Sequence, residues 1–214
     1  MIGQSEAILD PRDHWQSVYL EKDPTEVSWY EQIPAASLQL IEEADLSPAR
    51  PFLDVGGGAS KLAGELLSRS HSDITVADIS ASALTRAQAQ LGSRAEAIEW
   101  VEADVRSHDF ARQYALWHDR AVFHFMVTAR DQEAYLATLR RTLKADGHVV
   151  IATFGRDGPT RCSGLPVARY GSTDLAERLG PGFQLISEAL HVHDTPAGSH
   201  QQFLYAHFRR NGGH

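Results

Sequence analysis

Three consecutive glycines, Gly56, Gly57 and Gly58, follow a short apolar run that contains Asp54. Without a side chain, a residue can take positive φ, and a ligand can approach the main chain closely. The helical pattern after the glycines would present unpaired N–H groups and the positive end of its dipole to that ligand. The stretch therefore predicts a site for a nucleotide-like ligand. Alternatively, the glycines form only a sharp strand-to-helix turn.

Two further acidic residues stand at the ends of the next predicted strands. Asp78 lies about twenty residues past the glycines, where a carboxylate can accept both ribose hydroxyls of an adenosine. The same spacing serves nicotinamide cofactors, but Lys61 stands where their fingerprint has its last glycine. Asp104 ends the following strand, and an ionised carboxylate there can accept a hydrogen bond from an adenine amine. Alternatively, Asp104 is the N-cap of the next turn.

The elements that must position these residues alternate between strand and helix from residue 52 onward. This alternation predicts a parallel sheet with helices on both faces, in which ligands bind at the carboxyl ends of the strands. A turn over 194–198 joins the last two strands into a hairpin, so one antiparallel strand is expected near the C-terminal edge. The fold class is α/β, a Rossmann-like, doubly wound sheet of seven strands. We predict strands at 52–55, 74–77, 98–102, 120–125, 148–154, 184–193 and 202–209, and helices at 60–70, 81–91, 110–114, 131–143 and 173–179.

The chain length of 214 residues fits one domain, 1–214. Residues 1–50 are expected to form a helical cap, because Asp10 and Pro11 supply an N-cap and a first-turn proline. Residues 155–182 begin with a segment rich in Gly, Pro and charge that is too long for a simple connection. We interpret 155–182 as a substrate loop or lid.

The stretches Asp54-Val55-Gly56-Gly57-Gly58, Asp78-Ile79 and Glu102-Ala103-Asp104-Val105 together resemble the class I S-adenosylmethionine-dependent methyltransferases. The resemblance covers roughly 52–154, and its specificity comes from three motifs at consecutive strand ends. It implies that the glycines lie against the methionine part of S-adenosylmethionine, that Asp78, followed by Ile79, holds the ribose, and that Asp104 and Val105 frame the adenine. Ser60 departs from the family, since many members carry a further glycine there.

An aromatic segment precedes the first strand and comprises His14-Trp15, Tyr19 and Ser28-Trp29-Tyr30. It resembles the entry segment of a methyltransferase subgroup that includes protein-lysine enzymes and small-molecule enzymes of the thiopurine type. In such enzymes aromatic rings close over the sulfonium, and a cation over a ring face is favourable by about 0.5–2 kcal/mol. The resemblance implies that Trp29 contacts the cofactor and that Trp15 and Tyr19 contact the substrate. Alternatively, these rings pack a helix onto the sheet.

The methyl acceptor must approach the sulfonium in line, and some acceptors need a base for their proton. His124, at the expected end of the fourth strand and next to the cofactor, is the first catalytic candidate, and Tyr170 is the second. Alternatively, His124 is a hydrogen-bonded core residue, Cys162 a small buried side chain and Arg169 a solvated one. The candidates for substrate binding are Trp15, Tyr19, Phe125, Cys162, Arg169, Tyr170 and His193.

No metal site is expected. His191 and His193 should share one strand face near His200, but Asp194 should point to the opposite face and no cysteine is close in sequence.

Charge and cysteine content restrict the partners. The 20 Lys+Arg against 28 Asp+Glu give a formal charge of −8, which disfavours nucleic acid. No apolar run approaches the ~20 residues that span a bilayer, and residues 1–10 lack the pattern of a secretory leader. Cys162 is the only cysteine, which suits a reducing compartment. We therefore expect a cytoplasmic protein without a membrane or nucleic-acid partner.

The leading hypothesis is an S-adenosylmethionine-dependent methyltransferase that acts on an N, S or O atom of a small molecule and releases S-adenosylhomocysteine. An alternative in the same class is a protein-lysine methyltransferase, with a protein as substrate. A third hypothesis is a non-catalytic nucleotide-binding module, because a fold alone does not establish activity. An NAD-dependent oxidoreductase is disfavoured by Lys61.

Overall fold

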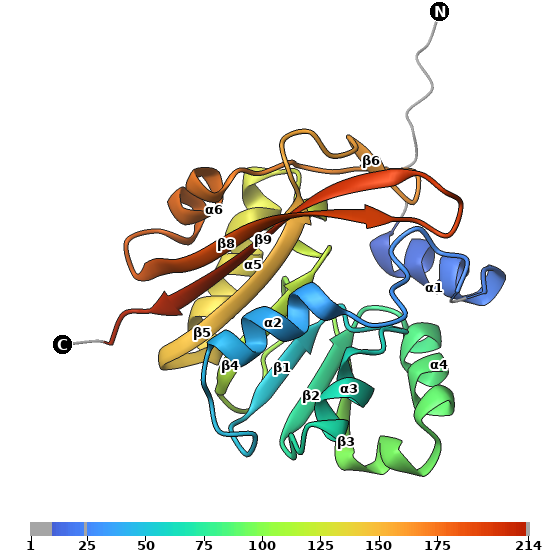
Figure 1. Cartoon of the computed structure of the whole chain (residues 1–214), viewed down its shortest axis with the longest axis horizontal. Coiled ribbons are helices and arrows are strands. Elements are labelled where there is room, and N and C mark those ends of the chain that lie inside the picture. The colour runs from blue at the N-terminus through green and yellow to red at the C-terminus, as the bar shows by residue number, and fades with distance from the viewer. Residues whose placement is uncertain (1–9, 24, 213–214) are drawn as a thin grey trace, which may run out of the picture.

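Seven strands form one sheet in the order β3-β2-β1-β4-β5-β9-β8 in the computed structural model, which describes residues 10–23 and 25–212 (Figure 1). Neighbouring strands from β3 to β5 run parallel, whereas β9 is antiparallel to both β5 and β8. The predicted mostly parallel sheet, with one antiparallel strand near the C-terminal edge, is confirmed. The strands are β1 (Phe52–Val55), β2 (Ile74–Asp78), β3 (Ile98–Glu102), β4 (Tyr114–Arg120), β5 (Leu143–Phe154), β8 (Phe183–Asp194) and β9 (His200–Arg210).

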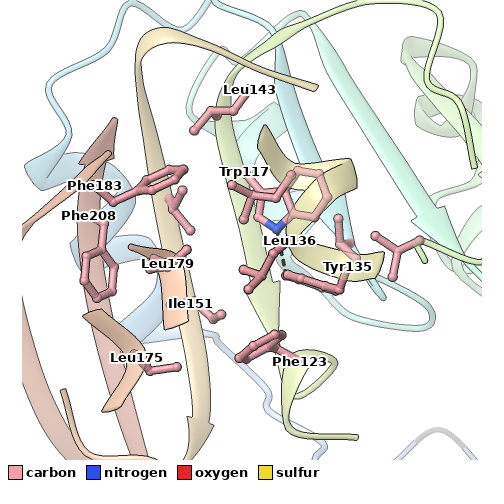
Figure 2. Close-up of a cluster of buried hydrophobic side chains, with 14 of the residues drawn as sticks. Trp117, Phe123, Tyr135, Leu136, Leu143, Ile151, Leu175, Leu179, Phe183 and Phe208 are labelled. Carbon is pink, nitrogen blue, oxygen red and sulfur yellow. Dashed lines mark hydrogen bonds between the residues drawn. The ribbon is translucent and has the colours of Figure 1, made fainter. Parts of the chain in front are cut away.

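Helices cover both faces of the sheet, which is why β1 and β2 are buried along their whole length. One apolar cluster joins the sheet to α2 (Ala35–Glu43), α3 (Leu62–Ser68) and α4 (Ala81–Leu91). The other joins it to α5 (Ala129–Thr142) and α6 (Ser172–Leu179). Figure 2 shows this second cluster, in which the Trp117 indole N–H donates to the Tyr135 hydroxyl at 2.9 Å. The remaining elements are α1 (Pro11–Glu21), η1 (Gly92–Ala97), η2 (Phe123–Phe125), β6 (Arg161–Cys162) and β7 (Leu165–Pro166).

Helix α1 begins as its sequence predicts, with the Asp10 carboxylate accepting from the Arg12 N–H at 2.8 Å and Pro11 in the first turn. Gln16 then fixes α1 to the start of α4 through three hydrogen bonds. Its amide nitrogen donates to the Ser82 hydroxyl at 2.6 Å, and its oxygen accepts from Ser80 Oγ and Ser82 N, each at 3.1 Å. The part of the expected cap at 1–9, and Pro24, lie outside the described residues.

The fourth strand differs from the prediction. It occupies Tyr114–Arg120 instead of 120–125, and 110–114 is not a helix. The polar residues His118 and Asp119 interrupt the apolar pattern from which a buried strand is predicted. Both are nevertheless buried, because each forms hydrogen bonds with other residues of the protein. His118 bonds to Asp54, and the Tyr135 hydroxyl donates to Asp119 at 2.5 Å.

The boundary between the helix predicted at 131–143 and the strand predicted at 148–154 also differs. Helix α5 ends at Thr142, and Leu143 is already extended and begins β5. Residues 144–147 therefore belong to the strand, with Asp146 at a φ of 59°. The expected substrate segment 155–182 holds the short β6–β7 hairpin and α6. Along 10–23 and 25–212, no helix has the length and apolar character needed to cross a membrane.

Candidate functional site

A cavity of about 900 Å³ lies at the carboxyl ends of β1, β2, β3 and β4. Helix α1, the β6–β7 hairpin and the start of β9 complete its wall. Ten of the residues that line it are candidates predicted from the sequence: Trp15, Tyr19, Trp29, Gly56, Asp78, Ile79, Asp104, Val105, Phe125 and Cys162.

The glycine turn needs glycine at all three positions. Gly56 and Gly58 have φ values of +66° and +37°, which side chains disfavour. A Cβ on Gly56 would lie 2.1 Å from Val122 Cγ2, and one on Gly57 would lie 2.5 Å from an oxygen of Asp54. The turn thus packs directly against its surroundings, and Gly56 presents its backbone to the cavity.

Asp54 holds the base of this turn. It is 2% exposed, and its Oδ1 lies 2.7 Å from His118 Nδ1, while His118 Nε2 lies 2.9 Å from the Ser37 hydroxyl. Asp54 and Gly57 line a smaller cavity of about 50 Å³ that shares Gly56, Tyr19 and other lining residues with the large one.

Asp78 is the most exceptional charged group of the large cavity. It is 6% exposed, its Oδ1 accepts from Ser80 N at 2.8 Å, and none of the described cations forms an ion pair with it. Burial, followed by repulsion from Asp54, raises the pKa of Asp78 to about 7. A buried carboxylate without a cationic partner, on a cavity wall, fits the hydroxyls of a ribose. These residues therefore fit an adenosyl cofactor.

Asp104 also lines the cavity, but it has a partner that the sequence analysis did not anticipate. Its carboxylate accepts several hydrogen bonds from Arg106, the shortest at 2.6 Å, and Arg106 also pairs with Asp131 at 3.0 Å. Burial would raise the pKa of Asp104, but the hydrogen bonds from Arg106 outweigh it and lower that pKa. The contact of Asp104 with an adenine amine stays a prediction.

Aromatic rings from separate segments meet at the cavity. The ring centroid of Trp15 lies 5.0 Å from that of Phe125 and 5.6 Å from that of Trp29, and Tyr19 lies 6.1 Å from Trp29. The structure thus brings together the entry segment and Phe125, as the prediction of a shared site requires. Trp15, Trp29 and Phe125 are each only partly buried, so they keep open surface beside the cavity.

Arg120 is a cavity residue that the sequence analysis missed. Its Nε donates to the Tyr205 hydroxyl at 2.8 Å, its Nη1 donates to the Trp29 carbonyl at 2.9 Å, and it pairs with Glu31 at 3.1 Å. Its guanidinium lies 4.9 Å from the ring centroid of Phe203. The sequence placed Arg120 at the start of the predicted strand 120–125, whereas it ends β4, so its position at the carboxyl edge of the sheet was hidden.

His124 is not placed as expected. It lies in η2 rather than at the end of a strand, it is fully buried, and it is absent from the residues that line the cavity. Burial, followed by the charge of Arg120, lowers the pKa of His124 to about 3, so the ring is neutral. The Phe154 N–H donates to its Nδ1 at 3.4 Å. Its catalytic role stays a prediction, and this position gives it no support.

Two other candidates lie along a different groove, beside α6. Tyr170 is buried, stacks on Phe123 at 5.4 Å, and accepts from Gln132 at 3.1 Å. Burial raises its pKa to about 12. Arg169 is exposed and donates to the Gly158 carbonyl at 3.2 Å. The structure does not bring this pair into the large cavity.

Cys162 and His193 are both buried near the cavity, but only Cys162 lines it. Burial raises the pKa of the Cys162 thiol to about 11, so it is neutral. His193 Nε2 donates to the Ser28 carbonyl at 2.8 Å, which ties the tip of the β8–β9 hairpin to the loop after α1 (Figure 1). Its ring therefore binds loop backbone.

Comparison with known proteins gives one family match. Residues 52–147 match a family model described as a methyltransferase domain. A curated relative, the malonyl-[acyl-carrier protein] O-methyltransferase of Anoxybacillus flavithermus, is 27% identical over 165 residues. That match covers 75% of this chain and 61% of the relative, so it spans less than two thirds of the relative's length.

Two solved structures share the fold across most of this chain. The 1,6-didemethyltoxoflavin-N1-methyltransferase of Burkholderia thailandensis, solved with 1,6-didemethyltoxoflavin and S-adenosylhomocysteine, has a TM-score of 0.69 at 20% identity. The match covers 94% of this chain and 87% of that one. The N-methyltransferase NodS of Bradyrhizobium japonicum, solved with S-adenosylhomocysteine, has a TM-score of 0.71 at 18% identity and coverages of 94% and 99%.

Proposed function

We propose that this chain, a class I methyltransferase by the domain at 52–147 and by its fold, transfers a methyl group from S-adenosylmethionine to a small molecule. The observation that carries the proposal is the buried carboxylate of Asp78, which has no cationic partner among the described residues and lies on the wall of a cavity beside the glycine turn. When bound, S-adenosylmethionine supplies an activated methyl group on a sulfonium.

The residues of one half of the cavity would hold this cofactor. Asp78 would accept hydrogen bonds from the ribose hydroxyls, and Val105 with Ile79 would cover the adenine. The backbone at Gly56 would lie against the methionine part, as the resemblance to the family implies. The half-buried rings of Trp15 and Trp29 would face the sulfonium, where a cation over a ring face is favourable.

The other half of the cavity supports a small acceptor. Arg120, Phe125 and Phe203 close it from β4, η2 and β9, and Cys162 closes it from the β6–β7 hairpin. A deep cavity with aromatic walls is typical of a small-molecule site. Since the Cys162 thiol is protonated and His124 is both neutral and away from the wall, the proposed catalysis consists of positioning the acceptor and excluding water.

Calorimetric titration with S-adenosylmethionine tests the activity at its first step. We expect binding by the wild type and a large loss of affinity in Asp78→Ala. The absence of wild-type binding, or equal binding in the variant, would refute the proposal. The acceptor class is tested by incubation with methyl-labelled cofactor and a cell extract. Label in the small-molecule fraction supports the proposal, whereas label in protein bands supports a protein-lysine methyltransferase.

A further inference from the structure

Gln201 is the unusual polar residue of the acceptor half of the cavity. It is 8% exposed, it lines the cavity at the start of β9, and its side-chain oxygen has no hydrogen-bond partner within 10–23 and 25–212. Leaving a buried polar atom without a partner costs free energy. A ligand that supplies the partner would remove that cost.

Two other glutamines, Gln132 and Gln202, show what a purely structural role looks like in this protein. The buried Gln132 donates to the Met126 carbonyl at 2.9 Å and to the Tyr170 hydroxyl at 3.1 Å. Gln202, the next residue along β9, accepts from Asp157 N at 3.3 Å. For Gln201, by contrast, the described part of the chain offers the side-chain oxygen no hydrogen-bond donor.

The position of Gln201 on β9 directs its side chain toward the acceptor half of the cavity. Residues 201, 203 and 205 share one face of β9 because side chains alternate along a strand. Phe203 on this face lines the cavity beneath the Arg120 guanidinium, and Tyr205 accepts a hydrogen bond from Arg120. Gln201 therefore continues a face that already forms the wall opposite the glycine turn.

The charge of this wall is balanced inside the protein. Arg120 pairs with Glu31 at 3.1 Å, and the side chains are 11% and 12% exposed. Because the positive charge already has a buried counter-ion, an anionic acceptor gains little from it. The carboxamide of Gln201 then offers an uncharged molecule one donor group and one acceptor group side by side.

We propose that the acceptor is an uncharged, flat molecule with adjacent N–H and C=O groups, and that Gln201 determines specificity by pairing with that edge. The pairing would be two parallel hydrogen bonds, with the aromatic walls of Phe125 and Phe203 holding the flat part. This inference rests on the proposed function, since it names the substrate class of the same cavity.

The test uses three probes with the same benzene ring on the full chain, in the presence and absence of S-adenosylhomocysteine. Benzamide carries the amide edge, benzoate carries a negative charge and toluene carries neither, and binding is followed by NMR titration. We expect benzamide to bind at least tenfold more tightly than benzoate. In Gln201→Met this preference should fall below threefold, while toluene and S-adenosylhomocysteine bind as in the wild type.

The matched control is Gln184→Met, an exposed glutamine on β8, which should keep the preference for benzamide. If Gln201→Met is unstable, Gln201→Asn keeps the amide but shortens the side chain by one methylene, so the paired hydrogen bonds move out of reach and the preference should also fall. Equal binding of benzamide and benzoate, or a preference that survives both variants, would overturn the inference. If the wild type does not bind S-adenosylhomocysteine, the result counts against the proposed function instead. The probes are also titrated without S-adenosylhomocysteine, so the two failures can be told apart.

Discussion

At the scale of single residues, Asp78 differs from most carboxylates of a folded protein. Burial raises its pKa from 3.8 to about 7, so folding favours its neutral form. The folded state then binds one proton more than the unfolded state between these two values, and stability falls as the pH rises through this window. A group with this property is costly to keep unless it serves a ligand.

We predict opposite pH effects on stability and on binding at Asp78. Asp78→Asn cannot ionise, so without ligand its melting temperature should exceed that of the wild type more at pH 8 than at pH 5. Ribose hydroxyls donate to the ionised carboxylate, so the affinity of the wild type for S-adenosylhomocysteine should fall by about fivefold from pH 7 to pH 6. Calorimetry across pH 6–8 measures this. A pH-independent affinity in the wild type would contradict the assignment of Asp78.

For His124 we predict an effect on stability and none on the pH dependence of the rate. Because its ring is buried, neutral and away from the cavity wall, His124→Gln should lower the melting temperature by several degrees through altered packing. The pH dependence of the methyl-transfer rate at saturating cofactor should keep its wild-type shape. If the variant stays folded but loses a titrating group between pH 5 and 8 from its rate profile, His124 is the base that the sequence suggested.

At the scale of elements, the predictable strands are those in which apolar residues predominate. Strand β1 lies at the predicted residues 52–55, and β3 lies at 98–102, because apolar runs are enough to identify them. Strand β4 could not be found in this way, since its residues His118 and Asp119 are polar and their partners come from distant elements. A local pattern cannot show that a polar residue will be buried with a partner.

We predict that Gln16 controls how firmly α1 closes the cavity. It joins α1 to Ser80 and Ser82, and Ser80 N also donates to Asp78. Gln16→Ala should weaken S-adenosylhomocysteine binding several-fold and speed hydrogen exchange in α1, because Trp15 and Tyr19 lose their anchor. Gln39→Ala, on the exposed face of α2, is the control and should change neither quantity. Unchanged exchange in Gln16→Ala would show that apolar contacts alone hold α1.

At the scale of the whole molecule, the cavity is made by segments far apart in the chain. The motifs at consecutive strand ends could be predicted because parallel strands bring their carboxyl ends to one edge. The opposite wall could not, since Arg120 ends a misplaced strand and Phe203 reaches the cavity only through the antiparallel pairing of β9 with β5. Tyr170 was expected to bind the substrate, but it lies along the other groove. The path of 155–170 depends on tertiary packing, which the sequence pattern does not show.

This arrangement predicts that ligand binding stabilises the molecule as a unit. S-adenosylhomocysteine at one hundred times its dissociation constant should raise the free energy of unfolding by about 2.7 kcal/mol, which corresponds to a melting temperature about 5–10 °C higher. Hydrogen exchange should slow in α1 and the β6–β7 hairpin, whose residues line the cavity, but not in α6, which lies along the other groove. Thermal scans and exchange mass spectrometry measure both effects. Slower exchange confined to the glycine turn would show that the cofactor binds without stabilising α1 and the β6–β7 hairpin. The prediction that binding stabilises these segments together would then be wrong.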